Sequence, residues 1–352
     1  MLDDALEACA EGRSAKAFAL FDALNELVPP DSIRLLIQSA KSTGCSVPLP
    51  LSSQTFQIGG YWAVGQASNV NAAPRDQVVQ FPEFSPIDSL TLTPEERPRG
   101  DGFVAAGLQV LSPVLSSKGL RLLAVGQLRR YAQETSYHSS QFLLGLEQPL
   151  PRLGASLQAQ ASHWHFGDDG QESQARLGLE GRFTQSQGFI LGYGIGLAST
   201  FTRASSRSRA HKGDLTLWGQ WAPKDFQLTV AIGFGEDQLG SGQRVGGDRR
   251  SQHAVVQLQA LLGSEVRASL SSGWAVLRDT KAYNEAFFGN QRRESNRHQL
   301  VLAIESRNPL FRMAHINVYG YLSAQAEDIK DRIPLFSSEG RSISLGFNAP
   351  LR

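Results

Sequence analysis

Residues 153–162 read LGASLQAQAS, and apolar side chains alternate in this stretch with small or polar ones. The alternation recurs over residues 174–183 (QARLGLEGRF) and 226–234 (FQLTVAIGF), and again over residues 343–351 (ISLGFNAPL). Successive side chains of a strand point to opposite faces, so each stretch predicts a strand with one apolar and one polar face.

Fourteen segments of this kind follow one another along the chain, and most have ten to fifteen residues. Strands of globular proteins average about 5–6 residues, whereas strands that cross a membrane need about 9–11. The predicted spans are 54–68, 102–112, 119–130, 138–148, 152–163, 172–184, 187–202, 213–222, 225–235, 252–262, 265–277, 297–306, 312–326 and 340–351.

The predicted connections alternate between short turns and longer loops. The longer ones cover residues 69–101, 131–137, 164–171, 203–212, 236–251, 278–296 and 327–339. Bacterial outer-membrane barrels have an even number of strands, tight periplasmic turns and longer extracellular loops. We therefore expect an all-β transmembrane barrel of about 14 antiparallel strands; a soluble sandwich is the alternative.

In such a barrel the polar faces would line a wet lumen and the apolar faces would meet lipid. The expected lumen-facing charges are Arg121, Arg176, Glu180, Arg182, Arg267 and Glu305. Aromatic residues near strand ends are expected to form girdles at the membrane interfaces: Trp62, Trp164, Phe201, Trp221, Phe234 and Trp274.

Composition limits the possible functions. Lys and Arg number 34 against 33 Asp and Glu, a net charge of +1, which argues against a nucleic-acid binder. The two cysteines, Cys9 and Cys45, are too few for a disulfide scaffold or a cysteine-based metal site. No apolar run is long enough for a transmembrane helix. The N-terminus lacks the pattern of a signal peptide, so we expect that the printed start is late or truncated.

Residues 1–46 differ from the rest because they are predicted to be helical. Gly12, Ala17, Phe21 and Pro29 have the spacing of a tetratricopeptide repeat, although an unrelated helical hairpin is the alternative. The domain prediction is thus a tetratricopeptide-like periplasmic segment over 1–46, a proline-containing linker over 47–53, and the barrel over 54–352.

The start of the barrel carries a short motif, SNVNAAP, which contains Ser68, Asn69, Val70, Asn71 and Pro74. It resembles the SNVN…P segment that opens the barrel of surface lipoprotein assembly modulators (Slam), where the segment also follows helical repeats and precedes a long loop. The two asparagines read as structural, because Asn side chains bond neighbouring backbone.

The resemblance implies an outer-membrane translocon that delivers lipoproteins or other client proteins to the cell surface, with its N-terminal helices in the periplasm. The implied partners are outer-membrane lipids and lipopolysaccharide, the client protein and the barrel assembly machinery. The alternatives are an exopolysaccharide export porin and a general outer-membrane porin. No cofactor, metal or catalytic residue is expected.

Several weaker patterns suggest other roles. His138 and Ser140 have the spacing of a barrel-enzyme pair, but they read better as loop-edge residues. His163 and His165, followed by Asp168 and Asp169, read better as interface and loop residues than as a metal site. The cations of the expected 203–212 loop would contact lipopolysaccharide phosphates, or would bind an acidic partner or polysaccharide: Arg203, Arg207, Arg209 and Lys212. The prolines of the 69–101 segment are expected to keep it from adding an extra strand, and the segment is expected to plug or gate the lumen.

Overall fold

The computed structural model divides the chain into two units, Met1–Thr55 and Phe56–Arg352. The described residues are 5, 8, 14–26, 56–80, 88–116, 119–167, 170–186, 189–203, 207–223, 226–242, 244–284, 288–313 and 316–349.

The described part of the first unit is the helix α2 (Ser14–Glu26). Ala17 and Phe21 are fully buried, which agrees with their expected place on one helical face. Gly12 and Pro29 of the predicted repeat, all of residues 27–46 and the predicted linker over 47–53 lie outside the described residues. Among the described helices, none is long and apolar enough to cross a bilayer.

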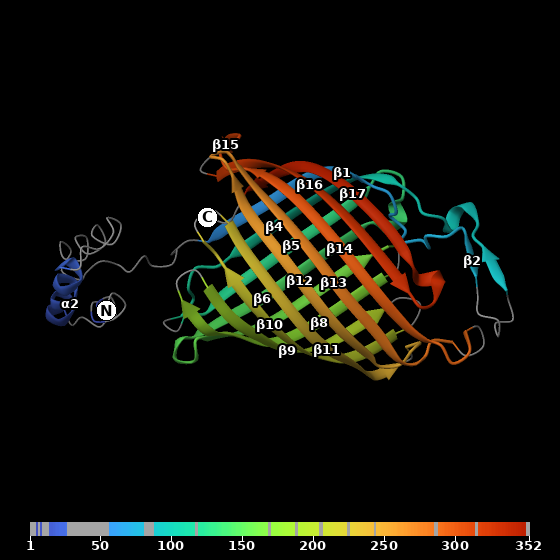
Figure 1. Ribbon diagram of the computed structural model, residues 1–352, viewed down its shortest axis with the longest axis horizontal. Coiled ribbons are helices and arrows are strands. Elements are labelled where there is room, and N and C mark those ends of the chain that lie inside the picture. Colours follow the sequence, from blue (N-terminus) through green and yellow to red (C-terminus); the bar gives the residue numbers. More distant parts are fainter. Residues whose placement is uncertain are drawn as a thin grey trace. The chain divides into compact units, whose positions relative to one another are not determined.

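The second unit is a closed barrel of fourteen antiparallel strands, as the alternation predicts (Figure 1). Each strand pairs with the next along the chain, and β17 pairs with β1 to close the ring. The strands are β1 (Gln57–Ala67), β4 (Asp101–Leu111), β5 (Arg121–Tyr131), β6 (Ser139–Leu150), β7 (Ala155–Phe166), β8 (Gly170–Ser186), β9 (Phe189–Arg203), β10 (Arg207–Trp221), β11 (Phe226–Gly242), β12 (Arg249–Leu262), β13 (Val266–Ala282), β14 (Arg292–Ser306), β16 (Ile316–Asp331) and β17 (Ser338–Ala349). A short strand, β15 (Phe311–Met313), pairs with the start of β16.

The two ends of the barrel differ. We call the end where β1 begins and β17 ends the turn end, and the opposite end the loop end. At the loop end, strands that were expected to stop continue towards each other. Phe166 of β7 pairs with Gly170 of β8, and Arg203 of β9 pairs with Arg207 of β10. The loops expected over 164–171 and 203–212 are therefore mostly strand. Their residues are largely polar, so hydropathy gave no sign of backbone pairing that extends past the apolar zone.

One set of side chains faces inward all round the ring. Ala63, Phe103 and Ala105 face inward and are nearly fully buried. The opposite face carries large apolar side chains that are exposed, such as Leu177 and Leu197. The outward aromatic residues include Trp62, Phe142, Phe183, Tyr193, Phe201, Trp221, Phe234, Trp274, Phe311 and Phe347. This outer surface is the kind that a barrel presents to lipid.

Trp164 is a correction to the expected girdle. The alternation of β7 continues without a break to Phe166, so Trp164 shares the inward face of Gln158 and Gln160. Its ring contacts that of Phe166, with 5.0 Å between the ring centroids. A Trp between two histidines looks like an interface residue, but the register decides which way it points.

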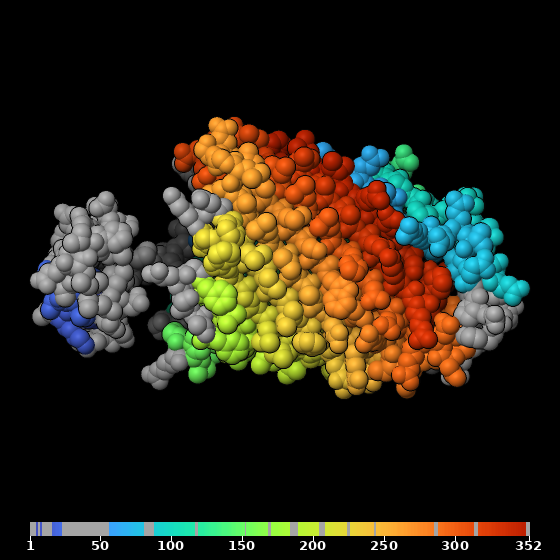
Figure 2. All heavy atoms as spheres, viewed as in Figure 1, coloured from blue at the N-terminus to red at the C-terminus, as the bar shows by residue number. Residues whose placement is uncertain are grey.

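The segment between β1 and β4 adds no strand to the barrel, as expected, but its described part does not plug the lumen. It contains a two-stranded sheet of β2 (Val78–Gln80) and β3 (Ser89–Thr91), followed by a 3₁₀ helix, η1 (Pro94–Glu96). Figures 1 and 2 show its blue-to-cyan described part gathered at the loop end, with β2 beyond the end of the barrel and not inside the lumen. Val79 is 2% exposed and β2 contacts η4 (Pro334–Phe336), so the segment rests on the β16–β17 connection.

Candidate functional site: the barrel lumen

Charged and amide side chains line the inner wall of the barrel. The strand register places all six residues that were assigned to the lumen on this face: Arg121, Arg176, Glu180, Arg182, Arg267 and Glu305. Further charges of both signs share it: Arg129, Lys212, Arg249, Arg293 and Arg297, with Asp101, Glu147, Glu172, Asp214, Asp237, Asp279, Glu327 and Asp331. The wall is polar along the whole barrel and carries no strong excess of either sign.

Several of these charges are paired across the wall. Arg176 of β8 reaches over β9 to Asp214 of β10, with 2.7 Å between Nη2 and Oδ2. Near the turn end, Arg267 Nη1 lies 3.7 Å from Glu305 Oε2, and Asn348 Nδ2 donates to Glu305 Oε1 at 2.7 Å. Paired charges of this kind keep the wall hydrophilic without presenting a single strong field.

Inward glycines let large side chains lie flat along the wall. The ring of Tyr61 covers Gly107, where a Cβ would collide with it. The indole of Trp218 covers Gly192 in the same way. Side chains that lie along the wall occupy less of the lumen than side chains that project from it.

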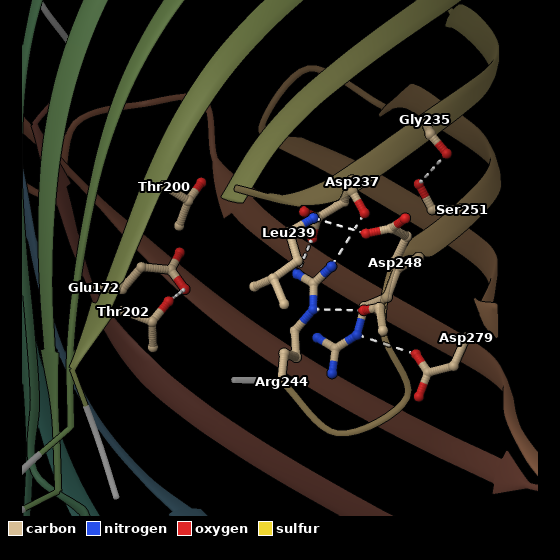
Figure 3. Close-up of polar contacts among 12 residues, drawn as sticks. Glu172, Thr200, Thr202, Gly235, Asp237, Leu239, Arg244, Asp248, Ser251 and Asp279 are labelled. Carbon is tan, nitrogen blue, oxygen red and sulfur yellow. Dashed lines mark hydrogen bonds and ion pairs between the residues drawn. The ribbon is translucent and has the colours of Figure 1, made fainter. Parts of the chain in front are cut away.

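A network of ion pairs surrounds the β11–β12 connection at the loop end (Figure 3). Arg244 Nη1 donates to Asp237 Oδ2 at 2.8 Å, and Arg244 Nε donates to the carbonyl of Gly247 at 2.8 Å. Arg249 Nε lies 3.1 Å from Asp279 Oδ1, and the Asp279 side chain is 1% exposed. These bonds hold residues 244–248 against β11, β12 and β13.

A second row of pairs continues this network on β14 and β16. Arg293 Nε lies 2.7 Å from Asp331 Oδ2, and its guanidinium stands 4.3 Å from the centre of the Phe336 ring. Arg297 pairs with Glu327 on the same two strands. These residues were not singled out from the sequence. The signal that could have found them is the alternation itself, which places every second residue on the inward face. Arg249, Ser251 and His253 of β12 are one such series.

The SNVN motif anchors the end of β1 at the loop end. It bonds to β17 on one side and to the segment before β4 on the other. Asn69 Nδ2 donates to the carbonyls of Ala73 and Glu339, each at 3.0 Å. Asn71 Nδ2 donates to the carbonyl of Arg97 at 2.8 Å, and Asn71 Oδ1 accepts from the Arg99 amide at 3.1 Å. The turn that follows includes Ala72 with a φ of 48° and leads into Pro74. Ser68 exchanges hydrogen bonds with the backbone of Arg341, its amide donating and its Oγ accepting, each at 2.9 Å. Val70 packs against the cluster around Phe103.

Two charged groups of this segment have shifted pKa values. The carboxylate of Glu134 lies 2.8 Å from Arg99 Nη1, and this hydrogen bond raises the pKa of Arg99. The backbone amide and the hydroxyl of Thr93 donate to Glu96 and lower the pKa of that carboxyl group. Both shifts favour the charged forms of these groups.

The cations expected in a surface loop belong instead to strands. Arg203 ends β9 and Arg207 begins β10, and of Arg207 only the backbone is described. Arg209 lies on the outward face, where its Nε donates to Ser199 Oγ at 3.3 Å. Lys212 points into the lumen. The four therefore do not form one cationic surface.

The histidines of the two patterns singled out from the sequence make unrelated contacts. Tyr131 donates its backbone amide to His138 Nδ1 at 3.2 Å, whereas Ser140 lies on β6. His163 Nδ1 lies 2.9 Å from Ser173 Oγ, and Asp168 and Asp169 are outside the described residues. In the part of the chain that the structure describes, no three His, Cys, Asp or Glu side chains gather as metal ligands would.

The sequence matches no model of a known protein family and no curated protein. Solved structures with a similar fold include a bacterial polysaccharide outer membrane secretin, with a TM-score of 0.38 and 10% identity over 83% of this chain and 98% of that one. CdiB from Acinetobacter baumannii gives a TM-score of 0.46 and 9% identity over 83% and 60% of the two chains. An anion-selective porin from Comamonas acidovorans gives 0.41 and 10% over 84% and 99%. The likeness concerns the barrel fold alone.

Proposed function

We propose that this protein is a transport barrel of the bacterial outer membrane, which passes a polar client through its lumen without chemical change. One observation carries this proposal. The fourteen strands close into a ring whose inner wall is polar and carries charges of both signs, while large apolar side chains cover the outside. A closed ring satisfies its backbone hydrogen bonds in lipid, and a polar lumen of this strand number has room for water and solutes.

The finer proposal concerns the client. The SNVN motif and its position between helices and a long loop support delivery of lipoproteins or other proteins to the cell surface, as in Slam. The N-terminal helices would then lie in the periplasm and receive the client. Lipopolysaccharide and the barrel assembly machinery would be further partners.

The test compares surface proteins, released by protease shaving, from cells with the gene, without it, and with two variants. Gly194→Trp adds an indole to the inward face of β9, where the nearest side-chain atom to a new Cβ is Thr216 Cβ at 4.0 Å. Gly213→Trp adds the same indole to the outward face of β10, beside Leu197.

We expect the deletion and Gly194→Trp to remove one or a few surface proteins whose total cellular amounts are unchanged, and Gly213→Trp to remove none. A surface proteome that does not respond to the deletion would contradict protein delivery. Single-channel conductance of the purified barrel tests the coarser proposal separately, because an open lumen conducts whatever its client is.

A sugar polymer is the second candidate for the client, as in an exopolysaccharide export porin. It is favoured by a cluster of aromatic side chains on the inner wall around Tyr61, Phe103 and Trp164.

A further inference from the structure

A cavity of about 290 Å³ opens on the inner wall between the middle of the barrel and the loop end. Strands β1, β4, β5, β6, β7, β16 and β17 contribute to it. Five aromatic side chains line it: Tyr61, Phe103, Tyr131, Trp164 and Tyr321. The rest of this wall carries mainly polar side chains. Rings gathered at one place on such a wall are not needed to exclude water, as they would be in a hydrophobic core.

The rings form a floor and open sides. Phe103 is 5% exposed and meets Tyr131 edge to face, with 6.1 Å between centroids, so these two make a packed floor. Trp164 is 45% exposed and Tyr61 is 36% exposed, and both face the lumen. Their rings are therefore available to a ligand, whereas those of the floor are not.

Polar groups complete the lining. The side-chain amides of Gln127 and Gln141 bond to each other and present further donor and acceptor atoms. Arg129 stacks on the floor, with its guanidinium 4.3 Å from the centre of the Phe103 ring. Among the described residues, no acidic side chain pairs with Arg129, although Arg249 and Arg293 on the same wall are each paired with an aspartate. This cation is available to an anionic ligand.

We propose that this pocket binds an acidic sugar unit, a hexuronate within an oligosaccharide. The apolar C–H face of a pyranose ring packs on an exposed aromatic ring, its hydroxyl groups exchange hydrogen bonds with the glutamine amides, and its carboxylate pairs with Arg129. The site goes beyond protein delivery and does not depend on it; it deepens the second candidate client by naming its chemical class.

A second group of lumen residues near the turn end provides a matched control. Arg182 and Trp218 line another cavity, so it too offers one arginine and one large ring. Glu147 and Glu180 line the same cavity, and these carboxylates would repel an anionic sugar.

The experiment measures binding of fluorescently labelled hexagalacturonate to the full-length protein in detergent micelles by anisotropy, with maltohexaose as the neutral competitor. Equilibrium binding does not require the channel to conduct, so a closed channel would contradict the transport proposal and leave this test valid. Folding of every variant is checked by its migration on unboiled gels.

We expect hexagalacturonate to bind, maltohexaose to compete poorly, and both Arg129→Gln and Trp164→Ala to weaken binding about tenfold. Arg182→Gln and Trp218→Ala are expected to leave it within about twofold. No binding by the wild type would overturn the proposal. Equal competition by maltohexaose, or the same loss in the control variants as in the pocket variants, would overturn it as well.

Discussion

Arg176 of β8 bridges the whole width of β9 to reach Asp214 of β10, with 2.7 Å between the charged atoms. The intervening inward residue is Gly196, and a Cβ there would collide with the Arg176 guanidinium and with Asp214. A glycine is therefore a requirement of this ion pair, and the pair braces three consecutive strands from inside the lumen.

Replacing Gly196 by leucine is expected to break that brace. The leucine side chain would take the place of the guanidinium, and Arg176 would project into the lumen, so single-channel conductance should fall. The thermal midpoint should also fall, with a cost of about 1–3 kcal/mol for forced repacking. Gly178→Leu is the control, because a Cβ at Gly178 has only an ordinary contact at 3.6 Å with the carbonyl of Ile195. Equal losses in both variants would argue against the brace.

The buried carboxylate of Asp279 predicts a large difference between two adjacent arginines. Arg249→Leu would leave that carboxylate without its partner at 3.1 Å in a site where it is 1% exposed, which costs about 3–5 kcal/mol. Arg250→Leu removes a partner of Glu236 at 3.6 Å on the outer face, where the two side chains are 72% and 50% exposed, and should cost at most about 1 kcal/mol. Urea unfolding in micelles measures both. A similar small cost for the two variants would mean that the pair does not stabilise the loop end.

Asn71 predicts a graded effect on the segment that precedes β4. Asn71→Ala removes a donor to Arg97 O and an acceptor for the Arg99 amide, at a cost of about 1–3 kcal/mol in local stability. Asn71→Asp keeps the acceptor and loses the donor, so its effect should be smaller. The rate of tryptic cleavage after Arg99 reports the loosening. Cleavage as slow in Asn71→Ala as in the wild type would show that the motif does not fasten this segment.

The barrel could be predicted from the sequence because its strands must show lipid one face and water the other. The alternation is already visible at Leu153, Leu157 and Gln158, and the number of times it recurs along the chain gives the number of strands. The rule weakens where the strands extend past the apolar zone. Arg207 to Lys212 read as a loop by composition, yet their backbone continues the β9–β10 ladder.

The lumen was predicted only in part, and for a related reason. Alternation assigned Arg176 and Glu180 to the inward face, but it gave no information about which charges meet across a strand, because that depends on register over three strands. The prediction for Trp164 was wrong because this residue looks like an interface residue. The alternation along β7 would have placed it on the inward face. The aromatic pocket brings residue 61 next to residue 321, a proximity that exists only once the ring is closed.

The closing pair of strands yields the last prediction, which concerns the route of the client. Val64 and Leu345 lie opposite each other on β1 and β17, and both face outward. Directly opposed residues of an antiparallel pair have the Cα spacing that a disulfide needs. Cysteines at these two positions, with Cys9 and Cys45 replaced by serine, should therefore lock the seam between the first and last strands.

If the barrel delivers a client protein as proposed, delivery should continue with the seam locked, because the eight residue pairs of β1 and β17 already join without a gap and the proposed route runs through the polar lumen. The control places cysteines at Ile195 and Leu215, an opposed outward pair on β9 and β10 away from the seam. Surface shaving before and after reduction gives the measurement. Delivery that stops only in the seam-locked protein, and returns when the disulfide is reduced, would show that the client leaves between β1 and β17, since unpaired strand edges can template another chain.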